Sequence, residues 1–391
     1  MIVGIDARLA LGRGRGWGRY AAELIRELAR CRGDGVDLRV LLPDSREAQW
    51  LASDIAGRLS VVTEPFVGAD SPSYADRALE SSDPSQALGA VDVLHSLTQF
   101  VPRTRIPRIL ATIHDIAPLS VPPFKSEIAD ATHVALRRLS EQEATIIAVS
   151  AYTKRELCDR ANFPAERILV IHEGAPSRYL ALLEPGRLDG RHQRPCASGM
   201  PGRYILYVGG AGPNKNLLRL VEAISLLRRH CGDVRLLLVG AREWGYDELV
   251  RQLPTTPASG SSWIEQRGFV EEEQLVDLYR HAAVVVLPSL HEGFGLPVLE
   301  AMALGGPVCC SRIPVLEEIG GSAAWYFEPH DAQDIARALL DVLGSADLAR
   351  ELRARGRQRA SRFTWRETAR QTLAAYGRMA PSAQPSGSLL S

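Results

Sequence analysis

The chain has 391 residues, which is enough for two domains that each bury a core. Lys plus Arg and Asp plus Glu both number 46, so the formal net charge is zero and no overall basic field points to nucleic acid as a partner. Six cysteines without a Cys-x-x-Cys pair or zinc spacing predict reduced thiols and a cytoplasmic location. No apolar run approaches the ~20 residues that cross a bilayer, so any membrane association, for example on the inner membrane face, is expected to be peripheral.

The first half of the chain alternates short apolar strands with amphipathic helices. We expect strands at residues 2–5, 38–42, 91–94, 109–113, 146–149 and 168–171. Apolar side chains at three- and four-residue spacing predict a helix over residues 20–29. This alternation indicates a parallel sheet with helices on both faces, which we assign to an N-terminal domain over residues 1–183.

A break in the pattern separates the two halves. Residues 184–202 are rich in Pro, Gly and Arg and have no apolar period, so we interpret them as a linker. The alternation restarts over a second domain, residues 203–363, and a last helix is expected at about 364–380, before a disordered tail at 381–391. Within the second domain, strands are expected at 204–208, 235–239, 283–287 and 308–310, helices at 216–228, 271–280 and 296–304, and two more helices between 331 and 362.

The segment LPSLHEGFGLPVLEAMALGGPV, residues 287–308, predicts a strand, a glycine loop and a helix that starts near Leu296. Free backbone N–H groups and the positive end of a helix dipole favour an anion such as a diphosphate at such a turn. Glu292 lies in the loop, and Glu300, eight positions later, is expected in the first helical turn. Paired carboxylates suit sugar or ribose hydroxyls, because each carboxylate accepts two hydrogen bonds. The alternative for Glu300 is a helix cap.

A second glycine-rich turn, YVGGAGPNKNLL, places Gly209 and Gly210 after a strand and Lys215 at the start of a helix. It is not a Walker A loop, because Asn216 stands where Ser or Thr must follow the lysine. It is not G-x-G-x-x-G either, because Lys215 occupies the third glycine position. A lysine at such a turn neutralises a diphosphate as a point charge. The alternative is a solvated surface lysine.

Two features of the first half are weaker signals. Gly16 and Gly18 precede an expected helix and would let the backbone approach a ligand closely, although a plain strand–helix turn explains them equally well. His114 falls at the expected end of a strand, the edge at which α/β sheets bind ligands. The alternative for His114 is a structural histidine.

Together these segments resemble glycosyltransferase family 4. The resemblance is carried by two glutamates separated by seven residues within H-E-G-F-G-L-P-x-L-E-A-M-A, by the Lys215 loop, and by IDAR, HDIAPL and AVSAYTKREL in the first half. It covers residues 2–376. It implies the GT-B fold, with two Rossmann-like α/β domains facing each other across a cleft and a C-terminal helix that crosses back to the N-terminal domain.

The resemblance also implies roles for residues. Glu300 should bind the ribose of a nucleotide sugar, Glu292 the donor sugar and Lys215 the phosphates. Many family members place an arginine in the Lys215 loop, but none lies between Tyr204 and Lys215 here. Family members usually carry Asn-Gly where this chain has Glu173-Gly174, a difference that we expect to affect only a loop. The implied catalytic set is His114, Lys215 and Glu292, and the implied donor-binding set is Gly16, Gly18, Gly209, Gly210, Lys215, Gly293, Phe294, Gly295, Leu296 and Glu300.

By the same resemblance, the chain is a retaining enzyme of polysaccharide biosynthesis that moves a hexose from a nucleotide sugar to a glycan or lipid-linked acceptor. The motifs IDAR and HDIAPL are similar to those of bacterial mannosyltransferases, and this resemblance favours GDP-mannose over UDP-glucose or a deoxysugar donor. No acidic cage is apparent, so we expect no metal and no cofactor besides the co-substrate. Acceptor recognition is assigned to residues 70–84 and 122–138.

Three alternatives stay open. An epimerase or phosphorylase of the same fold would isomerise or phosphorolyse its substrate rather than transfer a sugar. A nicotinamide-dependent dehydrogenase needs G-x-G-x-x-G after the first strand, a spacing that residues 12–18 lack. A non-catalytic sugar-binding module would tolerate the loss of Glu292, Glu300 and Lys215, yet all three are present.

Overall fold

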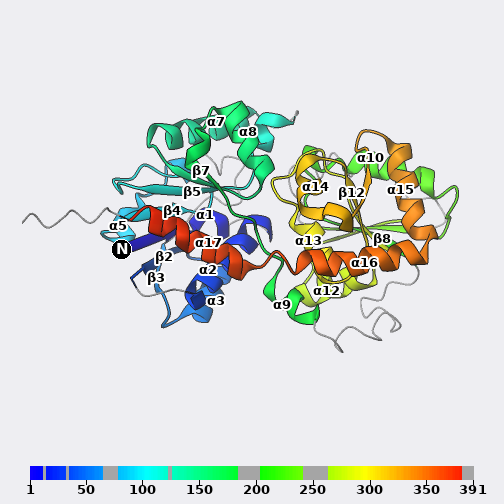
Figure 1. Cartoon of the computed structure of the whole chain (residues 1–391), viewed down its shortest axis with the longest axis horizontal. Coiled ribbons are helices and arrows are strands. Elements are labelled where there is room, and N and C mark those ends of the chain that lie inside the picture. The colour runs from blue at the N-terminus through cyan, green and yellow to red at the C-terminus, as the bar shows by residue number, and fades with distance from the viewer. Residues whose placement is uncertain are drawn as a thin grey trace, which may run out of the picture.

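The computed structural model describes residues 1–11, 15–31, 35–64, 78–121, 126–183, 203–240 and 263–380. These residues form two α/β domains that lie side by side along the longest axis of the molecule (Figure 1). The predicted linker 184–202, the predicted tail 381–391 and parts of both segments assigned to the acceptor lie outside the described residues.

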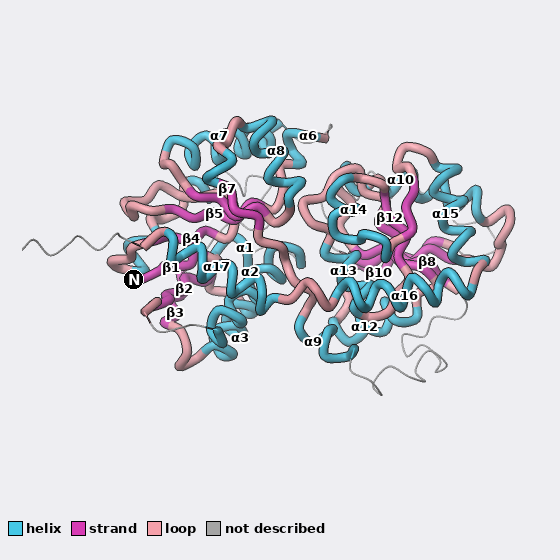
Figure 2. The backbone as a smooth tube through the Cα atoms, viewed as in Figure 1, coloured by secondary structure: helices cyan, strands magenta, loops and turns pink. Residues whose placement is uncertain are grey.

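The N-terminal domain contains a seven-stranded parallel sheet in the order β3-β2-β1-β4-β5-β6-β7. Helices cover both faces of this sheet (Figure 2). The central strands are continuous apolar runs because parallel sheets covered on both faces are buried throughout. The strands are β1 Ile2–Asp6, β2 Asp37–Pro43, β3 Ser60–Glu64, β4 Val93–Ser96, β5 Ile109–Ile113, β6 Thr145–Ala148 and β7 Ile168–Val170, and the helices are α1 Arg8–Leu11, α2 Arg15–Cys31, α3 Arg46–Ile55, α5 Pro84–Leu88, α6 Ala117–Ser120, α7 Ser126–Glu141, α8 Ala151–Ala161, η1 Ala165–Arg167, α9 Ser177–Leu180 and η2 Ala181–Leu183.

The C-terminal domain repeats this architecture with a six-stranded parallel sheet in the order β10-β9-β8-β11-β12-β13. In both sheets the order reverses beside the first strand of the domain, and ligands of open α/β sheets bind at such a switch point, outside the carboxyl ends of the strands. The elements are β8 Tyr204–Val208, η4 Pro213–Lys215, α10 Leu217–Leu227, β9 Arg235–Val239, β10 Ile264–Gly268, α12 Glu272–His281, β11 Val284–Leu287, α13 Leu296–Ala303, β12 Val308–Ser311, α14 Pro314–Gly320, η5 Gly321–Ala323, β13 Trp325–Phe327, α15 Ala332–Gly344 and α16 Ala346–Ala360.

The last described helix, α17 (Trp365–Arg378), leaves the C-terminal domain and packs on α2 of the first domain (Figure 1). Trp365 is fully buried there, edge-on to Tyr20 with ring centroids 5.5 Å apart. The Tyr376 hydroxyl lies 2.7 Å from His95 Nδ1. A Cβ at Gly174 would lie 2.3 Å from the Trp365 nitrogen, so only glycine lets the chain pass the start of α17. The predicted crossing helix is therefore confirmed.

Candidate active site

Lys215 and Glu292 form an ion pair that joins the two glycine-rich loops after β8 and β11 of the C-terminal domain. Lys215 Nζ lies 2.8 and 2.9 Å from the two Glu292 carboxylate oxygens. Ser289 donates its hydroxyl to the same carboxylate at 2.6 Å. Glu292 is buried and Lys215 is 24% exposed, so the pair lies in a partly desolvated position where charge–charge attraction is stronger than in water. The two residues thus lie in one site.

Two asparagines hold the Lys215 turn against the Glu292 loop. Asn214 is buried and donates its side-chain amide to the His291 carbonyl at 3.1 Å. Asn216 adopts a left-handed conformation with φ of 55°, which asparagine tolerates better than most residues. Its side-chain amide donates to the Pro288 carbonyl at 3.0 Å. The residues on both sides of Lys215 therefore fix the position of its backbone relative to Glu292.

Glu300 is buried in α13 and lies at the junction with the N-terminal domain. The prediction that it lies in the first helical turn is wrong: α13 begins at Leu296, so Glu300 is the fifth residue of the helix. Its carboxylate accepts a hydrogen bond from the Tyr279 hydroxyl at 2.7 Å and lies 3.3 Å from Arg19 Nε. Burial, and then the Glu300 carboxylate, raise the pKa of Tyr279 well above its ordinary value. Among the described residues no side chain caps α13, so the helix-cap interpretation of Glu300 does not hold.

Arg19 is a candidate site residue that the sequence analysis did not identify. It projects from α2 of the N-terminal domain and contacts two carboxylates of the C-terminal domain. Besides Glu300, its guanidinium donates to Glu272 at 3.2 and 2.9 Å and to the Tyr179 hydroxyl at 3.5 Å. Burial alone would lower its pKa, but Glu300 and the neighbouring groups raise it above its ordinary value. The only sequence signal for Arg19 is its place directly before the helix expected at residues 20–29; in the structure it is the fifth residue of α2.

The expectation that Gly16 and Gly18 form a loop is wrong. Helix α2 begins at Arg15, so both glycines lie in its first turn. No described atom lies within 4 Å of a Cβ placed at Gly16, which is exposed. The structure therefore shows no close approach that requires glycine at Gly16. Their assignment to the donor site stays a prediction.

His114 lies at the end of β5 and is 6% exposed. Its Nε2 is 3.1 Å from the Leu97 carbonyl, and its Nδ1 is 3.1 Å from the Glu173 carboxylate. Both ring nitrogens of His114 are therefore in contact with oxygens, one of a backbone carbonyl and one of a carboxylate, and these two contacts fix the orientation of the ring. The expectation that Glu173 affects only a loop is wrong, because Glu173 is buried and directly contacts the candidate catalytic histidine.

The loop before α13 lies directly against the N-terminal domain. A Cβ at Gly293 would lie 1.6 Å from the His114 carbonyl oxygen, so no larger residue fits there. Ser150, which also caps α8, donates its hydroxyl to the Gly293 carbonyl at 2.7 Å. The Glu292 loop and His114 are therefore neighbours across the domain junction.

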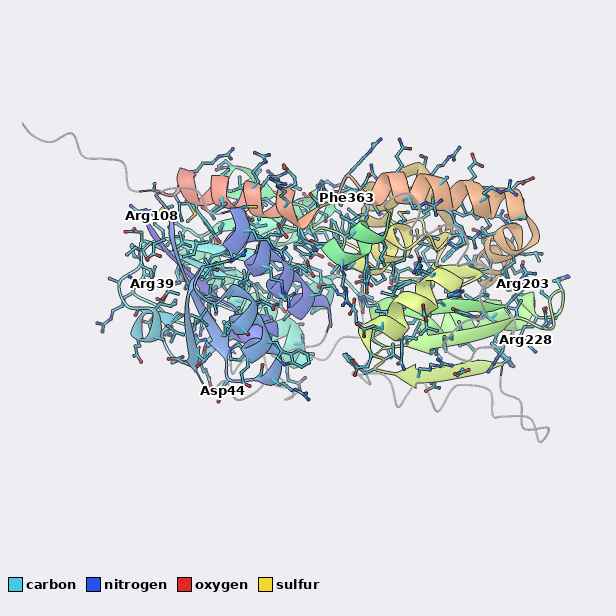
Figure 3. The ribbon with its side chains drawn as sticks, turned by 90° about the horizontal axis from the view of Figure 1, so that it is seen from below. Arg39, Asp44, Arg108, Arg203, Arg228 and Phe363 are labelled. Carbon is cyan, nitrogen blue, oxygen red and sulfur yellow. The ribbon has the colours of Figure 1, made fainter. Side chains whose placement is uncertain are left out.

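Phe294 packs into an aromatic group at the junction rather than toward an open site. Its ring lies 6.0 Å from His172 and 6.1 Å from Phe363, which Figure 3 labels between the two domains. Gly295 has a left-handed φ of 98° and turns the chain into α13, where Leu296 begins the helix. The side chain of Phe294 thus has a packing role, and its assignment to the donor site rests on its backbone.

A buried ion pair also joins the domains. His291 Nε2 lies 2.6 Å from a Glu156 carboxylate oxygen of α8. Burial alone would lower the pKa of His291, but the Glu156 hydrogen bond and nearby carboxylates raise it above its ordinary 6.5. Burial alone would raise the pKa of Glu156, but His291 and the other donors hold it below its ordinary 4.5. The charged form of this pair is therefore favoured.

Gly209 and Gly210 border a hollow at the carboxyl ends of β8, β9 and β10. A Cβ at Gly240 would lie 1.8 Å from the Gly209 carbonyl oxygen, so the loops after β8 and β9 pass at a distance that only glycine permits. The hollow is small and partly open to solvent. Its lining residues are Tyr207, Gly209, Gly210, Ala211, Leu217, Leu238, Val239, Gly240, Gln266 and Gly268.

The described residues contain no group of three or more His, Cys, Asp or Glu side chains placed to hold a metal ion. None of their helices is long and apolar enough to span a bilayer.

Two α/β domains with parallel sheets, a junction lined by paired carboxylates and cations, and a last helix that crosses back to the first domain define the GT-B fold class. Residues 14–177 match the family described as Glycosyltransferase Family 4, and residues 202–345 match Glycosyl transferases group 1. The O-antigen chain mannosyltransferase B of Escherichia coli is 31% identical over 286 residues, which cover 73% of this chain and 74% of that protein. The chain therefore belongs to glycosyltransferase family 4 and is a glycosyltransferase.

Other similar proteins agree with this assignment. The Escherichia coli serotype-specific mannosyltransferase WbdA is 28% identical over 295 residues, 74% of this chain but 36% of that protein, so the chain spans about a third of its length. The sucrose-phosphate synthase of Thermosynechococcus elongatus superposes with a TM-score of 0.72 at 19% identity, over 97% of this chain and 99% of that one. At that identity the likeness shows the fold alone, and the predicted fold class is confirmed.

Proposed function

We propose that this chain transfers a hexose, most specifically mannose from GDP-mannose, to a glycan or lipid-linked acceptor with retention of anomeric configuration. The observation that carries the proposal is the pairing of Lys215 with Glu292 beside His114, because it joins a cation for phosphates to a carboxylate for sugar hydroxyls. The mannosyl assignment is supported by the names of two relatives, an O-antigen chain mannosyltransferase and WbdA.

The parts of the donor have distinct places in this proposal. The base lies over the hollow at the ends of β8, β9 and β10. The ribose hydroxyls bind the Glu300 carboxylate, which is buried and already oriented by Tyr279. The diphosphate lies between Lys215 and the start of α13, whose N-terminal N–H groups and dipole favour negative charge. The sugar then lies between Glu292 and His114.

The chemistry follows from where charge develops. As the bond from the anomeric carbon to the diphosphate breaks, negative charge grows on the leaving phosphate, and Lys215 together with the α13 N-terminus stabilises it. The acceptor hydroxyl attacks on the face that the diphosphate leaves, and its proton passes to the departing phosphate oxygen. These residues supply the positive charge by themselves, so the proposal includes no metal and no further cofactor.

The test is a transfer assay with GDP-mannose, UDP-glucose and a deoxysugar nucleotide, offered with short glycan acceptors and followed by proton NMR. The expected product is an α-linked mannoside, formed from α-configured GDP-mannose. Lys215→Ala should abolish most of the turnover, whereas Arg219→Ala, which removes an exposed cation of the neighbouring helix, should not. A β-linked product would contradict retention, and isomerised donor or a sugar phosphate would favour an epimerase or a phosphorylase.

A further inference from the structure

The two glutamates of the motif are both bound to cations, and the two cations come from different domains. Glu292 is paired with Lys215 of its own domain, and Glu300 with Arg19 of the N-terminal domain. All four side chains are at most a quarter exposed. The two carboxylates that would bind donor hydroxyls are therefore already paired with cations, and one of these cations, Lys215, is the residue that would bind the phosphates.

A nucleotide sugar changes this balance of charge. When its hydroxyls bind the two carboxylates, they add no charge, yet they compete with Lys215 and Arg19 for the same oxygens. Two cations then lose part of their neutralisation in a poorly hydrated place, which is costly. A diphosphate carries about two negative charges, which match the two released cations. The nucleotide sugar thus supplies hydroxyls that replace the cations at the carboxylates and a diphosphate that binds the released cations.

Each carboxylate keeps a neutral donor when its cation leaves. Glu300 retains the Tyr279 hydroxyl at 2.7 Å, and Glu292 retains the Ser289 hydroxyl at 2.6 Å. Glu272, the other partner of Arg19, keeps Arg178 and the Tyr179 hydroxyl. The exchange therefore leaves no carboxylate of this cluster without a hydrogen-bond donor.

We infer that Arg19 is a donor-binding residue: it leaves Glu300 when the ribose binds and forms an ion pair with the donor diphosphate opposite Lys215. This inference rests on the proposed function and adds to it a residue from the opposite domain. Because Arg19 belongs to α2, its contact with the phosphates ties the N-terminal domain to a ligand held by the C-terminal domain.

The test compares a nucleoside diphosphate, which has both the ribose hydroxyls and the diphosphate, with the nucleoside, which has the ribose hydroxyls alone. Dissociation constants for GDP and guanosine, and for UDP and uridine, are measured by ligand-observed NMR, which detects millimolar binding. In Arg19→Met, GDP should bind about 10- to 100-fold more weakly, because a charged hydrogen bond is lost. Guanosine should bind equally or more tightly, because Glu300 no longer holds a competing cation. Arg19→Lys should give an intermediate ratio of the two constants.

Arg178 offers a matched control. Like Arg19, it pairs with Glu272, and both guanidinium groups lie 5.6 Å from the centre of the Tyr179 ring. Unlike Arg19, it is half-exposed and is not paired with Glu300. Arg178→Met should leave the guanosine-to-GDP ratio within about 2-fold of wild type. If Arg19→Met weakens guanosine and GDP equally, Arg19 only holds the domains together and the inference is overturned. If the wild-type chain binds neither GDP nor UDP, the proposed function itself fails.

Discussion

Replacing Glu300 by glutamine separates the ribose site from the sugar site. The Glu300 side chain is 7% exposed, so its carboxylate is a largely desolvated acceptor. An amide oxygen can still accept from Tyr279, and Arg19 keeps Glu272, so the fold should be retained. The amide cannot accept two ribose hydroxyls as well as a carboxylate can. A lost charged hydrogen bond is worth about 1.5–3 kcal/mol, or roughly 10- to 150-fold in the dissociation constant for GDP.

Glu292→Gln should behave differently. The Ser289 hydroxyl can still donate to the amide oxygen, but Lys215 loses the carboxylate that competes with a diphosphate. GDP should therefore bind equally or more tightly, while the turnover rate with the donor sugar falls. Calorimetric titration of both variants with GDP distinguishes the two roles, and Glu222→Gln, an exposed carboxylate of α10, is the control. Equal losses for the two variants, or a larger loss for Glu292→Gln, would refute the assignment.

Three further predictions concern the neighbouring groups. Glu173→Gln should lower kcat without weakening the binding of GDP, because the buried Glu173 carboxylate positions His114, and an unchanged kcat would remove the pair from the site. Activity should survive excess EDTA, and loss of turnover that Mg²⁺ or Mn²⁺ restores would contradict the metal-free proposal. The pair of His291 and Glu156 should contribute stability fully between about pH 4.5 and about pH 6.5, because the pKa of His291 is raised above 6.5 and that of Glu156 is lowered below 4.5. That contribution is lost as pH rises through the raised pKa of His291, and also as pH falls through the lowered pKa of Glu156. The melting-temperature difference between wild type and His291→Gln should therefore shrink between about pH 6 and about pH 9, and a constant difference would contradict the assignment.

The buried elements of the fold were predictable because parallel strands covered on both faces read as apolar runs. The strand at Tyr204–Val208 was predicted with the bounds that the structure gives. The strands Ser60–Glu64 and Ile264–Gly268 were missed, because both lie at sheet edges and carry polar, partly exposed residues. An edge strand pairs on one side only and can be partly exposed, so these two strands lack the continuous apolar pattern that the apolar edge strand Ile168–Val170 retains.

The site was predictable where its residues share a motif and not where they come from separate segments. Lys215, Glu292 and Glu300 were singled out from strand–loop–helix patterns that are typical of anion binding, and the roles assigned to them stay predictions. Arg19 did not, because its partner Glu272 is 253 residues away and belongs to the other domain. Glu173 was misjudged for the same reason, since it follows β7 whereas His114 follows β5, two strands away in the sheet, and a contact between such distant segments leaves no mark in the local sequence.

The most direct test of the account is a crystal structure of the chain with GDP. The account predicts that both ribose hydroxyls bind Glu300, that the diphosphate contacts Lys215 and Arg19, and that the Lys215–Glu292 and Arg19–Glu300 distances both lengthen from 2.8 and 3.3 Å. GDP bound elsewhere, or bound with both ion pairs intact, would contradict it.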